Sequence, residues 1–164
     1  MGRAQETLAL FLAEVGPLAV IDDDRLMEVG MGALDGMDDV EIETEYPGAR
    51  SGLMPGAWFF HGPGGERFAD FAARLDAVMA EIAADPAPQK VIVARGVVSR
   101  VIRGLHAGLG MAEALTGSPP QDAFYALEPG DVVRLVECCG KAAGGRSSAI
   151  LCRSKAQRRC NANP

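Results

Sequence analysis

The stretch from Glu66 to Ala94 constrains the fold most, because it joins a helical pattern directly to a strand-like one. Apolar side chains recur at steps of three and four residues over Glu66–Ala84, which predicts a helix that ends at Asp85-Pro86. Lys90–Ala94 (KVIVA) follows as a continuous apolar run, which is typical of a strand buried on both faces of a sheet. This alternation predicts an α/β fold.

The flanking segments predict further elements of the same kinds. Residues 3–15 and 98–107 carry helical patterns, and Leu18–Ile21 is a short apolar run that predicts a buried strand. Residues 25–64, which lie between this run and the helix that starts at Glu66, are rich in glycine and proline. We expect them to form a loop with one helical turn at Val40–Tyr46. A loop of this length inside a compact domain is typical of a functional region.

The C-terminal part predicts a hairpin followed by a basic tail. Ala123–Leu127 and Val132–Val136 flank a Glu-Pro-Gly-Asp turn, which favours a β-hairpin. Residues 141–164 hold six basic and no acidic side chains, whereas residues 1–140 hold 10 basic and 22 acidic ones. We therefore expect one acidic domain over residues 1–140 and a disordered tail over 141–164. The acidic charge of the domain argues against nucleic-acid binding.

The sequence gives no sign of a metal, a nucleotide or a membrane span. The cysteines form no C-x-x-C pair and only two histidines are present, so no metal site is expected. The glycine-rich stretches lack the patterns of nucleotide-binding loops, and no apolar run reaches the length of a bilayer. We predict a cytoplasmic protein with no cofactor and with free thiols at Cys138, Cys139, Cys152 and Cys160.

Several segments, in the same order along the chain, resemble the histidine phosphatase (phosphoglycerate mutase-like) superfamily. GRAQET at residues 2–7 is similar to the family's Arg-Ala-x-x-Thr helix opening, and LMEVGMGALDG at 26–36 to its Leu-x-Glu before a glycine-rich loop. The helix that opens at Gly-Gly-Glu, the KVIVA segment and the closing hairpin complete a similarity over residues 2 to about 138. The resemblance implies a three-layer α/β/α sandwich around a mostly parallel sheet.

The resemblance also implies roles for four residues. Glu28 matches the family's acid/base glutamate, which gives a proton to the leaving oxygen. Arg3 matches a phosphate-binding arginine, and Arg95 with Gly96 stands where the family has its second catalytic histidine and the glycine after it. An arginine can still bind phosphate there, but it cannot exchange a proton at neutral pH. The alternatives are a solvated arginine at position 3 and an ordinary surface carboxylate at position 28.

The nucleophile of the family is missing from the printed residues. Its Arg-His-Gly motif precedes the Arg-Ala-x-x-Thr helix in the family, and neither His61 nor His106 matches its position. The resemblance therefore implies a domain truncated at its N-terminus, without its first strands. We expect the isolated chain to be unstable or to need a partner, because unpaired backbone groups cost about 1–3 kcal/mol each when buried.

These features predict a pseudoenzyme of the family that is inactive or nearly so. One alternative is an active phosphomonoesterase or mutase whose true N-terminus lies outside the printed sequence. Another is a non-catalytic module that binds phosphate or a protein partner. The resemblance implies a phosphorylated small molecule or a phosphoprotein as the substrate.

Overall fold

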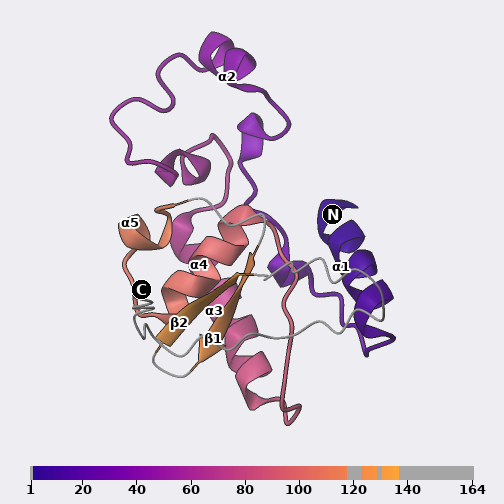
Figure 1. Cartoon of the computed structure of the whole chain (residues 1–164). Coiled ribbons are helices and arrows are strands. Elements are labelled where there is room, and N and C mark those ends of the chain that lie inside the picture. Colours follow the sequence, from indigo (N-terminus) through magenta and orange to yellow (C-terminus); the bar gives the residue numbers. More distant parts are fainter. Residues whose placement is uncertain (1, 118–122, 129–130, 137–164) are drawn as a thin grey trace, which may run out of the picture. The chain divides into compact units, whose positions relative to one another are not determined.

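A computed structural model describes residues 2–117, 123–128 and 131–136 (Figure 1). The chain divides into two compact units, Met1–Pro119 and Pro120–Pro164, which are described separately below. Helices make up the described part of the first unit, and a β-hairpin that of the second. The expected tail over 141–164 and the expected domain boundary at residue 140 lie outside the described residues.

Two helices form the core of the first unit. α3 (Phe68–Ala84) buries the side chains of Phe71, Leu75 and Val78 at helical spacing. α4 (Gly96–His106) packs beside it, which confirms both predicted helices with starts shifted by two residues. The short α5 (Met111–Ala114), which sequence patterns did not reveal, contacts α4. Its contact is close, because a Cβ at Gly104 would lie 2.3 Å from the Cβ of Ala114.

The long loop between residues 24 and 66 contains four short helical segments. They are the 3₁₀ helices η1 (Asp24–Leu26), η2 (Gly32–Leu34) and η3 (Ala57–Phe60), and the α-helix α2 (Asp39–Glu45). α2 confirms the helical turn expected there, and it begins with a capping box made by Asp38 and Glu41. η3 ties the loop to the core, because the ring of Phe60 packs edge-on against Phe68 and Phe71.

The N-terminal segment packs differently. α1 (Gly2–Val15) is a helix, as predicted, but it buries no residue. The strand predicted at Leu18–Ile21 is wrong, since this segment is irregular and Ile21 is 84% exposed. The strand predicted at Lys90–Ala94 is wrong in the same way, and Val91 is 60% exposed. A strand needs a neighbour for its backbone N–H and C=O groups, and neither segment pairs with a strand within the described residues.

The second unit confirms the predicted hairpin. β1 (Ala123–Glu128) pairs antiparallel with β2 (Asp131–Val136), in a register that runs from Ala123 opposite Val136 to Glu128 opposite Asp131. This is the one sheet within the described residues, so the parallel sheet of a three-layer sandwich is not seen in them. None of the helices in the described ranges is long and apolar enough to cross a lipid bilayer.

Candidate active site

The carboxylate of Glu28 lies at the N-terminus of α4. Its Oε2 accepts a hydrogen bond of 3.4 Å from the backbone N–H of Val97, in the first helical turn, while Oε1 accepts one of 3.2 Å from Val29. A helix N-terminus favours a negative group, because its first N–H groups have no partners within the helix. Only a quarter of the Glu28 side chain is exposed, so the carboxylate is held at this point.

Arg95 directly precedes α4 and lies beside Glu28. Its Nε is 3.9 Å from Glu28 Oε2, and 47% of its side chain is exposed. Gly96 is the first residue of α4, so the structure brings together three of the four site residues predicted from the sequence. A guanidinium beside helix N–H groups can bind an anion, and a neighbouring carboxylic acid can supply a proton.

Arg3 is the predicted site residue that the structure does not bring to this point. It lies in the first turn of α1 and is exposed. Within residues 2–117 its side chain forms no ion pair, although its carbonyl oxygen accepts a hydrogen bond of 2.9 Å from the Thr7 hydroxyl. Its role as a phosphate ligand stays a prediction.

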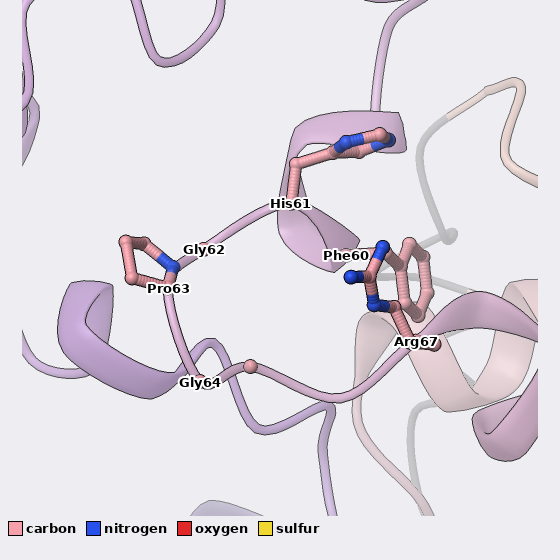
Figure 2. Close-up of a pocket in the computed structure, with 7 residues that line it drawn as sticks. Phe60, His61, Gly62, Pro63, Gly64 and Arg67 are labelled. Atoms are coloured by element: carbon pink, nitrogen blue, oxygen red, sulfur yellow. The ribbon is translucent and has the colours of Figure 1, made fainter.

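Neither histidine contacts Glu28. His106 is the last residue of α4, nine residues after Val97, and a rise of 1.5 Å per residue places it roughly 14 Å away along the helix. His61 is exposed and lines a surface hollow of about 360 Å³ (Figure 2). The other residues that line this hollow are Phe60, Gly62, Pro63, Gly64, Gly65 and Arg67. Within the described residues neither imidazole is bonded to Glu28 or Arg95.

Two glycines hold the loop after Glu28 against the loop before α3. Gly32 has a φ of 63°, and a Cβ there would lie 2.3 Å from the carbonyl oxygen of Pro63. A Cβ at Gly62 would lie 2.1 Å from the carbonyl oxygen of Met31. Only glycine permits both approaches, and the backbone N–H of Ala33 donates to Pro63 across the same contact. The segment after Glu28 is thus fixed against the loop before α3.

An ion-pair network joins the segment before Glu28 to α3. Arg25 Nη2 lies 2.7 Å from Asp23 Oδ2 and 2.6 Å from Glu81 Oε2. Hydrogen bonds from Arg25 lower the pKa of both carboxyls, and the same bonds raise the pKa of Arg25. These residues orient η1, which leads directly into the Glu28 segment.

Comparison with known proteins identifies a family and a set of solved structures. The sequence model of the histidine phosphatase superfamily (branch 1) matches residues 1–131. A mycobacterial glucosyl-3-phosphoglycerate phosphatase in complex with VO3 is 28% identical with a TM-score of 0.63, over 75% of this chain and 63% of that one. The same enzyme with inorganic phosphate is 26% identical with a TM-score of 0.64, over 82% of this chain and 71% of that one.

A more distant structure shows the same fold. Bacillus stearothermophilus YhfR is 23% identical with a TM-score of 0.61, over 83% of this chain and 69% of that one. Together these likenesses place the chain among α/β proteins of the phosphoglycerate mutase-like fold. The chain spans less than two thirds of the VO3 complex. No curated protein matches it.

Proposed function

Since the chain belongs to the histidine phosphatase superfamily, we propose that its Glu28–Arg95 site binds the phosphate group of a phosphorylated molecule with little or no turnover. The observation that carries this proposal is the position of Arg95. Arg95 directly precedes α4, and its Nε lies 3.9 Å from Oε2 of Glu28. A phosphate at this position would meet a fixed cation and helix N–H groups together.

Each residue of the site has a distinct proposed role. Arg95 and the backbone N–H groups from Gly96 onward hold the phosphate oxygens, and Glu28 in its protonated form gives a proton to the leaving oxygen. Arg3 adds a second cation when α1 approaches the site. The interaction between Glu28 and Val97 breaks when phosphate takes over the helix N–H groups.

The low turnover that we propose rests on the residue at position 95. Arg95 stands where the family has its second catalytic histidine. A guanidinium stays charged at neutral pH, so it cannot accept or give a proton during phosphoryl transfer. Loss of an acid/base group typically lowers a rate by about 10²–10⁴-fold.

The proposal extends to the fold. We propose a three-layer α/β/α sandwich around a mostly parallel sheet, which the family match and the α/β fold of the structural neighbours support. We further propose one domain over residues 1–140 and a cytoplasmic location.

The proposed ligand is a small phosphorylated metabolite, with a phosphoprotein as the alternative. The name of one 28% identical neighbour gives glucosyl-3-phosphoglycerate as its substrate, and a structure of that neighbour contains inorganic phosphate. These likenesses support a small phosphate ester for this chain. The exposed side of Arg95 leaves the bound phosphate open to solvent, which suits a group attached to a larger molecule.

The test combines binding with turnover. Inorganic phosphate should raise the melting temperature of the full chain, since a ligand at 100 times its Kd stabilises by about 2.7 kcal/mol. Arg95→Gln should abolish this rise, whereas Arg67→Gln should keep it. Arg67 is a matched control because it also directly precedes a helix and is exposed. The binding proposal is wrong if phosphate does not raise the melting temperature of the natural chain. It is also wrong if phosphate raises the melting temperature of Arg95→Gln by the same amount.

Hydrolysis of an aryl phosphate by the natural chain and by Arg95→His then separates the alternatives. We expect both to be inert or nearly so, because neither His61 nor His106 is bonded to Glu28 or to position 95 within the described residues. Turnover by the natural chain would contradict the proposed inactivity and would favour an active phosphomonoesterase. His61 and His106 would then be the next residues to replace.

A further inference from the structure

We infer that Arg74, held in place by Glu66, is a positioning residue for Glu28. The inference deepens the proposed function, on which the role of Glu28 rests. Arg74 lies in the middle of α3, and Glu66 lies two residues before that helix begins. Within the described residues neither side chain bonds to Arg95, Gly96 or Val97, so any effect on the N-terminus of α4 passes through Glu28.

The guanidinium of Arg74 holds the backbone that leads to Glu28. Its Nη1 donates to the carbonyl oxygen of Arg25, and its Nη2 donates to that of Met27 at 2.9 Å. A longer contact of 3.5 Å joins Nη2 to the carbonyl oxygen of Glu28 itself. The side chain of Arg74 therefore contacts three carbonyl oxygens in the segment that ends at Glu28.

Glu66 fixes both Arg74 and the backbone that follows Glu28. Its carboxylate pairs with Arg74 through two contacts, 2.7 Å to Nε and 3.0 Å to Nη2. Its backbone N–H donates to the carbonyl oxygen of Gly30 at 2.7 Å. Both side chains of the pair are only 22% exposed, so water competes little with these bonds. Glu66 thus orients Arg74 through its side chain and holds Gly30, two residues after Glu28, through its backbone N–H.

The core of the unit supports this arrangement. The guanidinium carbon of Arg74 lies 4.5 Å from the ring centre of Phe71, and Phe71 is fully buried. α3 also packs along α4, which carries Val97 at its start (Figure 1). The same helix therefore supports the two groups that meet in the hydrogen bond, the Glu28 carboxylate and the Val97 N–H. Without Arg74 the carbonyl groups before Glu28 lose their shared donor, and the carboxylate is free to leave α4.

The test follows the backbone amide resonance of Val97 during a pH titration of the full chain. In the natural chain this resonance should shift as the carboxylate that accepts its hydrogen bond takes up a proton. Glu28→Gln should abolish the shift, which identifies its source. Arg74→Gln should remove most of it while the amide resonances of the buried residues Leu75 and Val101 stay in place. A general structural role would instead move these core resonances as well.

A milder variant keeps the test decisive if Arg74→Gln does not fold. Glu66→Gln keeps the size of the side chain and its backbone N–H, but removes the charge that orients Arg74. We expect a Val97 titration shift that is smaller than in the natural chain, and an unchanged shift in the control Arg67→Gln. A full Val97 shift in a folded Arg74→Gln or Glu66→Gln variant would overturn the inference.

The readout separates this inference from the proposed function. The Val97 titration reports the contact with Glu28 and requires no phosphate. If phosphate fails to bind but the shift depends on Arg74, the positioning role stands and the binding proposal falls. If phosphate binds and the shift is independent of Arg74, the positioning role falls and the binding proposal stands.

Discussion

The helical core and the N-terminal arm of the first unit have similar sequence patterns but different packing. The helical core, defined as α3 and α4, buries apolar side chains along both helices. The N-terminal arm, residues 2–21, also carries apolar residues at helical and strand-like spacing, yet α1 buries none and Ile21 is 84% exposed. In the arm the helical pattern therefore forms its helix without burial, whereas the strand-like pattern gives neither a strand nor burial.

The physical reason lies in the backbone. A helix closes its own hydrogen bonds, so α1 forms without a partner, whereas a strand must find those bonds on another strand. α3 and α4 meet each other and need no further element to cover their facing sides. Within the described residues, no helix or strand packs on α1 as extensively as α3 packs on α4. Four experiments test this contrast, from the largest expected effect to the smallest.

Truncation of one leucine in each region gives the largest contrast. Leu75 is fully buried in α3, and Leu75→Ala should lower the free energy of unfolding by about 2–5 kcal/mol through lost contacts and a cavity. Leu10 in α1 is 72% exposed, and Leu10→Ala should change it by less than about 0.5 kcal/mol. Urea denaturation followed by circular dichroism measures both. Equal costs would mean that α1 is packed as tightly as α3.

The second experiment asks whether the loop joint at Gly62 belongs to the tightly packed region. Gly62→Ala places a Cβ 2.1 Å from the carbonyl oxygen of Met31, and should cost about 1–3 kcal/mol of unfolding free energy. Gly30→Ala is the matched control, because no atom lies within 4 Å of its Cβ, and should stay within about 0.5 kcal/mol. The same denaturation series measures both variants. Similar values would show that the two loops are not in close contact.

The third experiment uses pH to probe the link between η1 and α3. Arg25 lowers the pKa of Asp23 and Glu81 in the folded chain, so this link stabilises the fold above the ordinary carboxyl pKa of about 4. The stabilisation is lost as the pH falls through the lowered pKa values. Arg25→Gln should therefore lower the melting temperature at pH 7 by a few degrees at most, and the difference should shrink at pH 3.

Arg3→Gln in the arm serves as the control for this pH experiment. Arg3 forms no ion pair within residues 2–117, so its replacement should leave the pH dependence of the melting temperature unchanged. An Arg25→Gln profile that runs parallel to that of the natural chain at both pH values would contradict the role of the ion pairs.

The smallest effect on stability is expected at the exposed end of the arm. Ile21→Lys should change the unfolding free energy by less than about 0.5 kcal/mol, because the side chain already meets solvent. It should nevertheless reduce aggregation, which exposed apolar segments favour. Light scattering at rising protein concentration measures this. Val40→Lys on α2, where the valine is 74% exposed, should have no such effect.

Sequence patterns predicted the helices and the hairpin because those elements are specified by nearby residues. The 3.6-residue repeat of α3 and the Glu-Pro-Gly-Asp turn of the hairpin act within a few positions of the chain. The strands at Leu18–Ile21 and Lys90–Ala94 were predicted wrongly because pairing is a property of two segments. α5 went unnoticed because four residues are too few to show a period.

The site was predicted in part, for a similar reason. The family resemblance singled out Glu28, Arg95 and Gly96, and the structure brings these three together, while their roles stay predictions. The sequence singled out Glu66 only as the opening of a helix and Arg74 not at all, because both act on the backbone of residues about 36 to 49 positions earlier. A contact between a side chain and a distant carbonyl oxygen leaves no pattern of residue types in the sequence.

The close approach of Gly32 and Gly62 has a consequence for the residues between them. Ala33 bonds to Pro63, and Gly30 bonds to Glu66, so the intervening chain is a loop that is closed at its base. The entropy of closing such a loop depends weakly on its length, and a doubling costs only about 0.6 kcal/mol. The segment from α2 to η3 can therefore gain or lose residues while the backbone around Glu28 stays where it is.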